Sequence, residues 1–233
     1  MRFTILGFLL LSFCKLYSQA DVVAADSLVV KVDSLYREDQ FYFSLTYNTL
    51  SKKPNGVSQS KFSSGISFGF LRDMPISKKR QIAVATGLGF TYNNYNQNLA
   101  ISGSAQNPSY EVIGANTAFD KNKISTLTID VPLEFRWRTS TYESHKFWRI
   151  YSGLKFSYLL LDNAIFNGAT GDTKISGNKD FNKLQYGAYL SAGYNTINLY
   201  VYYGLNPLLE AQTTTAESFA LQALNFGVIF YIL

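Results

Sequence analysis

The feature that most constrains this chain is a repeated two-residue alternation of apolar and polar side chains. It recurs in eight stretches of about ten residues between Phe41 and the C-terminal residue. Successive side chains of a β-strand point to opposite faces of a sheet, so each stretch predicts a strand with one apolar face. The pattern therefore predicts an all-β protein. The predicted strands comprise residues 40–50, 62–72, 81–93, 124–138, 146–161, 183–194, 197–206 and 219–232.

Residues 127–138 show the alternation most clearly. Val131 and Leu133 belong to one apolar face, while Asp130 and Glu134 belong to the opposite, polar face. An apolar outer face suits a barrel in lipid, whereas a soluble sandwich would turn the same face inward. The alternation alone does not separate these two folds, so the length of the connections has to decide.

The connections alternate between long and short along the chain. Long ones comprise residues 51–61, 94–123, 162–182 and 207–218, and short ones comprise residues 73–80, 139–145 and 195–196. Outer-membrane barrels combine an even number of strands with long extracellular loops and short periplasmic turns. We therefore predict an eight-stranded antiparallel transmembrane β-barrel of the outer-membrane type with long extracellular loops. It would lie in the outer membrane of a Gram-negative bacterium, with both termini in the periplasm.

The N-terminus has the layout of a secretory signal peptide. Arg2 precedes an apolar run, and small residues follow it, with cleavage expected after Ser18 or Ala20. Cleavage would remove Cys14, which is the one cysteine of the chain. The mature protein would then have neither disulfides nor thiol chemistry.

The domain organisation follows from this signal. Residues 1–20 are the predicted signal peptide, residues 21–39 a periplasmic N-terminal extension and residues 40–233 the transmembrane β-barrel. Loss of Arg2 and Lys15 with the signal lowers the formal net charge from +5 to +3. No basic stripe accompanies this mild charge, so we expect no nucleic-acid partner.

Aromatic residues are placed where a membrane barrel carries its two aromatic girdles. Trp137 and Trp148 flank one short turn, so they would lie at the same membrane rim. Tyr92, Tyr95 and Tyr158 would belong to the opposite rim. The alternative is that the tryptophans are core residues of a sheet, and the alternation around them favours the girdle.

Charged residues occupy several of the predicted inward positions. An eight-stranded barrel is just wide enough for side chains to fill it, and buried charges must pair. We expect an interior charge network that closes the lumen, with a wet proton or ion path as the alternative. Its predicted members are Arg72, Asp130, Glu134, Arg136, Arg138, Arg149 and Lys155.

The sequence offers little to catalysis. Its one histidine, His145, lies in a short turn beside Lys146, and the GLGF motif at 87–90 lies inside a predicted strand with no helix after it. No metal-ligand spacing and no phosphate-binding loop is present. We therefore expect no enzyme activity, no metal and no cofactor.

The first short turn is strongly basic. Lys78, Lys79 and Arg80 follow a proline in this turn and form a candidate docking site for a periplasmic partner or for phosphate head groups. The plain alternative is a solvated turn without a binding role.

Four segments resemble the PorT family, called SprT in gliding bacteria. They are REDQFYFSLTYNTL (37–50), GVSQSKFSSGISFGFLRDMPISKKR (56–80), GLGFTYNNYNQNL (87–99) and DVPLEFRWRTS (130–140). Members of this family are outer-membrane barrels of Bacteroidota associated with the type IX secretion system. The similarity covers most of the mature chain.

The resemblance implies an accessory or assembly component of type IX protein secretion and, in gliding species, of adhesin export. It implies other secretion components as partners, and it supplies no catalytic residues. The last strand, LNFGVIFYIL (224–233), resembles the signal read by the barrel insertion machinery, so this machinery and outer-membrane lipid are further expected partners. The alternative function is that of a generic small porin-like barrel with an envelope-structural or surface ligand-binding role.

Overall fold

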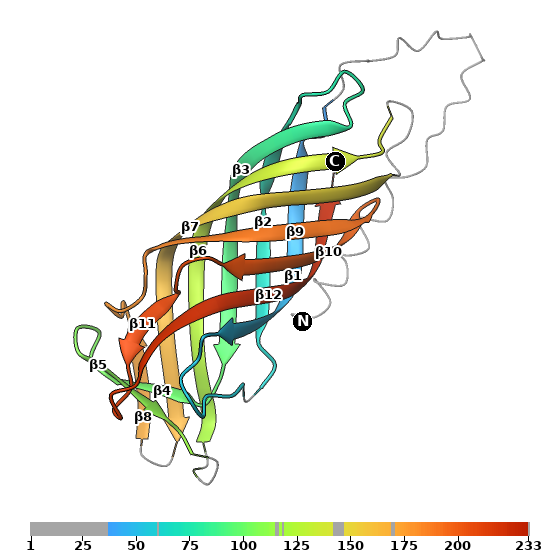
Figure 1. Cartoon of the computed structure of the whole chain (residues 1–233). Coiled ribbons are helices and arrows are strands. Elements are labelled where there is room, and N and C mark those ends of the chain that lie inside the picture. Colours follow the sequence, from blue (N-terminus) through green and yellow to red (C-terminus); the bar gives the residue numbers. More distant parts are fainter. Residues whose placement is uncertain are drawn as a thin grey trace, which may run out of the picture. The chain divides into compact units, whose positions relative to one another are not determined.

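Eight antiparallel strands pair side by side in a ring within the part of the chain that the structure describes (Figure 1). This computed structural model describes residues 37–59, 61–114, 117, 119–141, 147–168 and 171–232. Pairing between the first and last strands completes the ring, from Phe41–Ile232 to Ser51–Gln222. In order around the ring the strands are β1 (Gln40–Ser51), β2 (Ser64–Pro75), β3 (Ile82–Asn96), β6 (Phe119–Arg138), β7 (Trp148–Gly168), β9 (Leu184–Tyr194), β10 (Ile197–Gly204) and β12 (Ser218–Ile232).

The two faces of these strands differ as the alternation predicts. In β6, Val131, Leu133 and Phe135 are exposed on the outer face, while Asp130 and Glu134 are buried in the interior. β10 alternates exposed and buried residues along its whole length. A sheet whose apolar side chains point outward suits lipid and not water. The structure therefore confirms the predicted all-β fold and the eight strands of its ring.

Two strands extend well beyond the length that a membrane requires. β6 has 20 residues and β7 has 21, whereas a tilted strand crosses the hydrocarbon core in about 9 to 11 residues. Their pairing contains a bulge, because Leu127 pairs with Leu161 and Thr128 with Leu159. Leu160 is the extra residue, so the inward and outward positions of β7 change phase beyond it.

Four further strands lie at one end of the ring, which we call the loop end (Figure 1). The sequence predicts no strand in these connections, and that expectation is wrong. β4 and β5 pair as a separate hairpin, β8 pairs with β7, and β11 pairs with β12. Their bounds are Leu99–Gly103 for β4, Pro108–Val112 for β5, Gly171–Ser176 for β8 and Leu209–Gln212 for β11.

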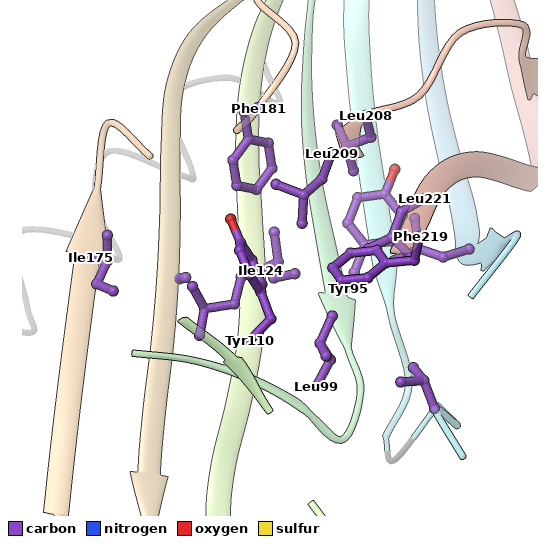
Figure 2. Packing of buried hydrophobic residues seen from close by; sticks show 14 of the residues in the cluster. Tyr95, Leu99, Tyr110, Ile124, Ile175, Phe181, Leu208, Leu209, Phe219 and Leu221 are labelled. Atoms are coloured by element: carbon purple, nitrogen blue, oxygen red, sulfur yellow. The ribbon is translucent and has the colours of Figure 1, made fainter. Parts of the chain in front are cut away.

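The loop end has a hydrophobic core of its own, shown in Figure 2. Its side chains come from ring strands and from the added strands together. Tyr95 belongs to this core and is only 2 % exposed, so its predicted place in an aromatic girdle is wrong. The core includes Tyr95, Leu99, Ile101, Tyr110, Ile124, Ile175, Phe181, Leu208, Leu209, Phe219 and Leu221.

The opposite end, which we call the turn end, lies where β2 leads to β3, β6 to β7 and β9 to β10. β9 and β10 are joined there by a two-residue turn in which Asn195 has a left-handed φ of 57°. Asparagine adopts this conformation more readily than most residues, so it suits a tight hairpin. No helix within the described ranges is both long and apolar enough to cross a membrane. The predicted signal peptide, most of the predicted extension and His145 lie outside the described residues.

Candidate functional site

The centre of the interior at the turn end is a carboxylate held by two arginines. Asp73 of β2 accepts hydrogen bonds from Arg138 at 2.9 and 2.8 Å and from Arg136 Nη1 at 3.0 Å. All three side chains are fully buried. Charge-assisted, two-point pairs of this kind hold both partners in a defined geometry. The strands β2 and β6 are therefore linked across the interior, over the intervening β3.

Glu134 extends the network to the other side of the ring. Arg136 Nε donates to Glu134 at 2.8 Å, and the hydroxyl of Tyr231 on β12 donates to the same carboxylate at 3.1 Å. The guanidinium of Arg136 also lies over the ring of Tyr151, 4.8 Å from its centroid. The hydroxyl oxygen of Tyr231 lies 3.2 Å from Oγ of Ser191 on β9. Side chains from four strands thus meet in one hydrogen-bonded layer.

One predicted member of the network points the wrong way. Arg72 is exposed on the outer face of β2, while its neighbours Leu71 and Asp73 are buried. The strand alternation continues through this position, so Asp73 and not Arg72 is the inward residue. The prediction for Arg72 is wrong. The other six predicted members, Asp130, Glu134, Arg136, Arg138, Arg149 and Lys155, are buried as expected.

A second residue that the sequence analysis missed is Glu38, which lies just before β1. It is buried, and its carboxylate lies 3.6 Å from Arg138 Nη1. Its backbone amide donates to Asp73, and its carbonyl accepts from Arg136 at 3.2 Å. The end of the predicted N-terminal extension therefore packs into the network. No alternation of side chains precedes residue 40, so the sequence carried no strand signal for it.

The corrected set of interior charges is balanced. The predicted network contains two acids and five bases, a formal charge of +3. When Arg72 is removed from it and Glu38 and Asp73 are added, the network contains four acids and four bases, a formal charge of 0. Neutrality matters because an uncompensated buried charge is strongly destabilising. The eight residues are Glu38, Asp73, Asp130, Glu134, Arg136, Arg138, Arg149 and Lys155; Asp162, the other buried charged residue in the described part of the chain, lies at the loop end.

Lys155 and Arg149, like Arg136, have aromatic neighbours. Lys155 lies 3.7 Å from Asp130 and 4.4 Å from the centroid of the Tyr202 ring. Arg149 makes no ion pair with any described residue, and its guanidinium lies 4.5 Å from the ring centroid of Phe147. A cation that lies over an aromatic ring is attracted to the face of the ring, which offsets part of the hydration energy that the cation loses on burial.

The interior between the charge pairs is filled. A cavity of only about 20 Å³ lies there, bordered by Tyr42, Glu134 and Lys155 among others. That volume holds about one water molecule. Gly69 and Gly89 are required beside it, because a side chain at either position would overlap the ring of Tyr42. Among the residues that the structure describes, the side chains around this cavity therefore leave little space for water.

The predicted girdle residues lie on the outer face. Trp137 and Trp148 are exposed at the turn end, and Trp148 packs against Tyr194 with ring centroids 5.4 Å apart. Tyr92 and Tyr158 are exposed farther toward the loop end. None of these four side chains is part of the interior. Their role at the membrane rims remains a prediction.

The basic turn contributes to the structure through the backbone of Arg80. Lys78 and Lys79 are exposed, and neither makes an ion pair with a described residue. Arg80 is half-buried with a left-handed φ of 59°, and its carbonyl accepts a hydrogen bond from Arg138 Nε at 3.0 Å. The two lysines are therefore free for a partner, whereas the backbone of Arg80 supports the interior network. No metal-binding cluster occurs among the residues that the structure describes.

Comparison with known proteins identifies the family of this fold. Residues 19–210 match the outer membrane protein beta-barrel domain family. The chain belongs to that family. It is thus an outer-membrane β-barrel protein, in agreement with its apolar outer face and ring of strands.

A solved structure and a search of curated sequences complete the comparison. The chain is similar to Ail, the attachment invasion locus protein of Yersinia pestis, whose crystal structure is a complex with the heparin analogue sucrose octasulfate. The two are 12 % identical with a TM-score of 0.36, over 84 % of this chain and 100 % of Ail. The search of curated protein sequences found no match.

Proposed function

We propose that this outer-membrane barrel is an accessory or assembly component of type IX protein secretion, with a part in gliding motility where the bacterium glides. The pathway comes from the resemblance of residues 37–99 and 130–140 to the PorT family. The filled, charge-balanced lumen is the observation that carries the proposed role. A barrel without a passage acts through its ends and its outer wall, so it supports secretion without conducting the cargo.

In this proposal the turn end faces the periplasm and the loop end faces the outside, following the loop rule of outer-membrane barrels. Lys78 and Lys79, exposed at the turn end, are the candidate contacts for other secretion components. The barrel insertion machinery and outer-membrane lipid are the remaining proposed partners. The proposed role needs no enzyme activity and no cofactor.

A deletion experiment tests the secretion role. Removing the gene from the bacterium that encodes it should retain type IX cargo inside the cell, and the wild-type gene should restore export. Normal export from the deletion strain would contradict the proposal. It would favour the second candidate, a barrel that binds surface ligands through its loop end, for which the folded core at that end is the supporting observation.

A substitution experiment tests the basic turn. Replacing Lys78 and Lys79 together by Ser should weaken export several-fold at unchanged barrel abundance, because substitutions at exposed positions alter stability by only about 0.5 kcal/mol. Arg80 is kept, because its backbone carbonyl holds Arg138. The matched control is Lys121→Ser with Lys174→Ser, two exposed lysines at the loop end. Normal export with the double lysine substitution would reject docking at this turn and leave the secretion role to the deletion test.

A further inference from the structure

The wall of the barrel has a gap where β7 changes its partner. β7 pairs with β9 as far as Tyr158–Leu184, and it pairs with β8 only from Asn163–Ser176 onward. Between these points the chain at 177–183 leaves the sheet, and a single backbone hydrogen bond of 2.8 Å joins Leu159 to Lys183. The bulge at Leu160 lies in the same interval. The barrel surface is therefore interrupted at this place.

A groove of about 470 Å³ occupies this gap. Cavities of this size hold a small ligand or the head group of a larger one. It is more than twenty times the volume of the cavity in the lumen, about 20 Å³. Its lining consists of Gln106, Tyr158, Leu159, Leu160, Asp162, Gly177, Asn178, Lys179, Phe181 and Lys183.

The inner wall of the groove is built from buried polar groups. Asp162 is 8 % exposed and accepts a hydrogen bond of 2.9 Å from the backbone amide of Asn178, which is 4 % exposed. Asn178 Nδ2 donates to the Tyr110 hydroxyl at 2.9 Å, and that hydroxyl donates to Asp180 at 2.9 Å. Phe181 also lines the groove and belongs to the loop-end core, where Figure 2 labels it. Such a network fixes the groove before any ligand arrives.

The outer rim of the groove joins the lipid-facing surface. Tyr158 and Leu160 line the groove and are exposed on the outer face of β7. Leu161 and Leu184 continue this apolar surface on either side. A molecule in the groove would therefore have its apolar part in contact with surface that also faces lipid chains.

Lys179 and Lys183 stand at the polar side of the groove. Both are exposed, and neither makes an ion pair with any residue in the described part of the chain. Neither nearby acid pairs with them: Asp162 accepts a hydrogen bond from Asn178 through Oδ2 only, and Asp180 accepts one from Tyr110. Two unpaired ammonium groups beside an apolar rim suit an amphiphile whose head group carries phosphate.

We propose that this groove binds a phosphorylated glycolipid of the outer leaflet. Its phosphates would contact Lys179 and Lys183, its sugar hydroxyls would donate to Asp162, and its acyl chains would lie along Tyr158 and Leu160. The inference goes beyond the secretion role and rests on that proposal only for the outward placement of the loop end. The groove presents the carboxylate of Asp162 as well as two lysines. A carboxylate accepts hydrogen bonds from sugar hydroxyls but repels a phosphate ion, so the groove suits a phosphorylated sugar better than phosphate alone.

Titration of the purified full chain in detergent tests the site, with binding followed by native mass spectrometry. The probes are diphosphorylated lipid A, the same lipid without phosphates, and phosphatidylethanolamine. Diphosphorylated lipid A should bind at least tenfold more tightly than either of the others. The double substitution Lys179→Ser with Lys183→Ser should lower this affinity at least tenfold, since charge-assisted contacts to phosphate are lost.

The control is Lys121→Ser with Lys174→Ser, which removes the same charge from exposed positions elsewhere at the loop end. It should bind lipid A as the wild type does. Equal affinity of the groove variant and this control would overturn the proposal, as would equal binding of phosphatidylethanolamine or of the dephosphorylated lipid. Because binding is measured on the isolated barrel, a normal secretion phenotype on gene deletion leaves this result unchanged.

Discussion

Arg138 and Asp73 form a two-point ion pair of 2.9 and 2.8 Å across the interior of the barrel, between strands that are not neighbours in the ring. Both side chains have no exposed area. Because Arg136 binds the same carboxylate, Asp73 neutralises part of two buried arginines at once. The pair therefore links β2 to β6 across the interior, although the two strands are not neighbours in the ring.

Loss of the Asp73 charge should be strongly destabilising. Asp73→Asn keeps the shape of the side chain but leaves two buried arginines short of a counter-charge, which costs about 3 to 5 kcal/mol when one partner of a buried pair is removed. Urea unfolding of the barrel in lipid vesicles measures this free energy. Arg72→Gln, at the exposed neighbouring position, is the control and should change stability by less than about 0.5 kcal/mol.

A larger effect of Arg72→Gln than of Asp73→Asn would contradict the inward placement of Asp73. A double-substitution cycle of Asp73→Asn with Arg138→Gln then separates the pair from its surroundings. We expect the two effects to be less than additive, since the second substitution removes a charge that the first has already left unpaired.

The comparison between Arg72 and Asp73 also shows where sequence reasoning reaches its limit. The alternation predicts which residues face inward as long as a strand is followed to its true end. The predicted second strand ends at Arg72, and its last charged residue is therefore placed in the interior. The inward positions of this strand are Gly69 and Leu71, so the alternation makes Asp73 the next inward residue. No alternation of side chains indicates that Glu38 is buried, because its burial depends on contacts with residues far away in the sequence.

The loop end was beyond prediction for a different reason. Leu160 is an extra residue in β7, and it shifts the alternation of every position that follows. Tyr95 is in phase with the inward Ala83 and Thr91 of β3, so its burial follows the alternation of that strand. The other members of the core come from segments far apart in the sequence, and no single strand encodes their contact. The eight ring strands were predictable because each one carries its own pattern.

The outer face of β6 should respond to charge according to depth. Val131 lies near the middle of the strand length that faces lipid, so Val131→Arg should cost about 2 to 4 kcal/mol. Trp137→Arg, on the same face near the turn end, should cost at most about 1 kcal/mol for its charge, because arginine reaches water at a membrane interface. Vesicle unfolding of both variants measures the difference. Equal stability of Val131→Arg and the parent would mean that the lipid-facing side is assigned wrongly.

The orientation of the barrel can be measured with single cysteines, since the mature chain is predicted to contain none. Thr214→Cys at the loop end should react with a membrane-impermeant maleimide on intact cells, whereas Lys79→Cys at the turn end should not. Both should react after the outer membrane is permeabilised, which confirms that each thiol is accessible. The reverse pattern on intact cells would place the turn end outside.

Tyr110 should make the packing of the loop end sensitive to alkaline pH. Burial raises the pKa of its hydroxyl above the ordinary value, because the phenolate would lose water and face Asp180. The folded form therefore holds its proton more tightly than the unfolded form. Stability from this group is complete below about pH 10 and falls as the pH rises toward the raised pKa.

Protease sensitivity of the loop end between pH 9 and pH 12 measures this effect, and Tyr110→Phe is the matched variant. The phenylalanine variant should be less resistant at neutral pH, since it lacks the hydrogen bond to Asp180. Its resistance should change less with pH than that of the parent. A parallel loss of resistance in both proteins would assign the alkaline response to another group.

The filled lumen makes a prediction about conductance. The interior cavity of about 20 Å³ holds roughly one water molecule, and the charges around it are paired across the ring. An ion entering this space would have to break pairs such as Arg138–Asp73, so purified protein in planar bilayers should show no steady conductance of porin size. A porin prepared in the same detergent serves as the control for insertion and should give stable steps. Stable steps of similar height from this barrel would contradict a closed lumen and favour the wet ion path.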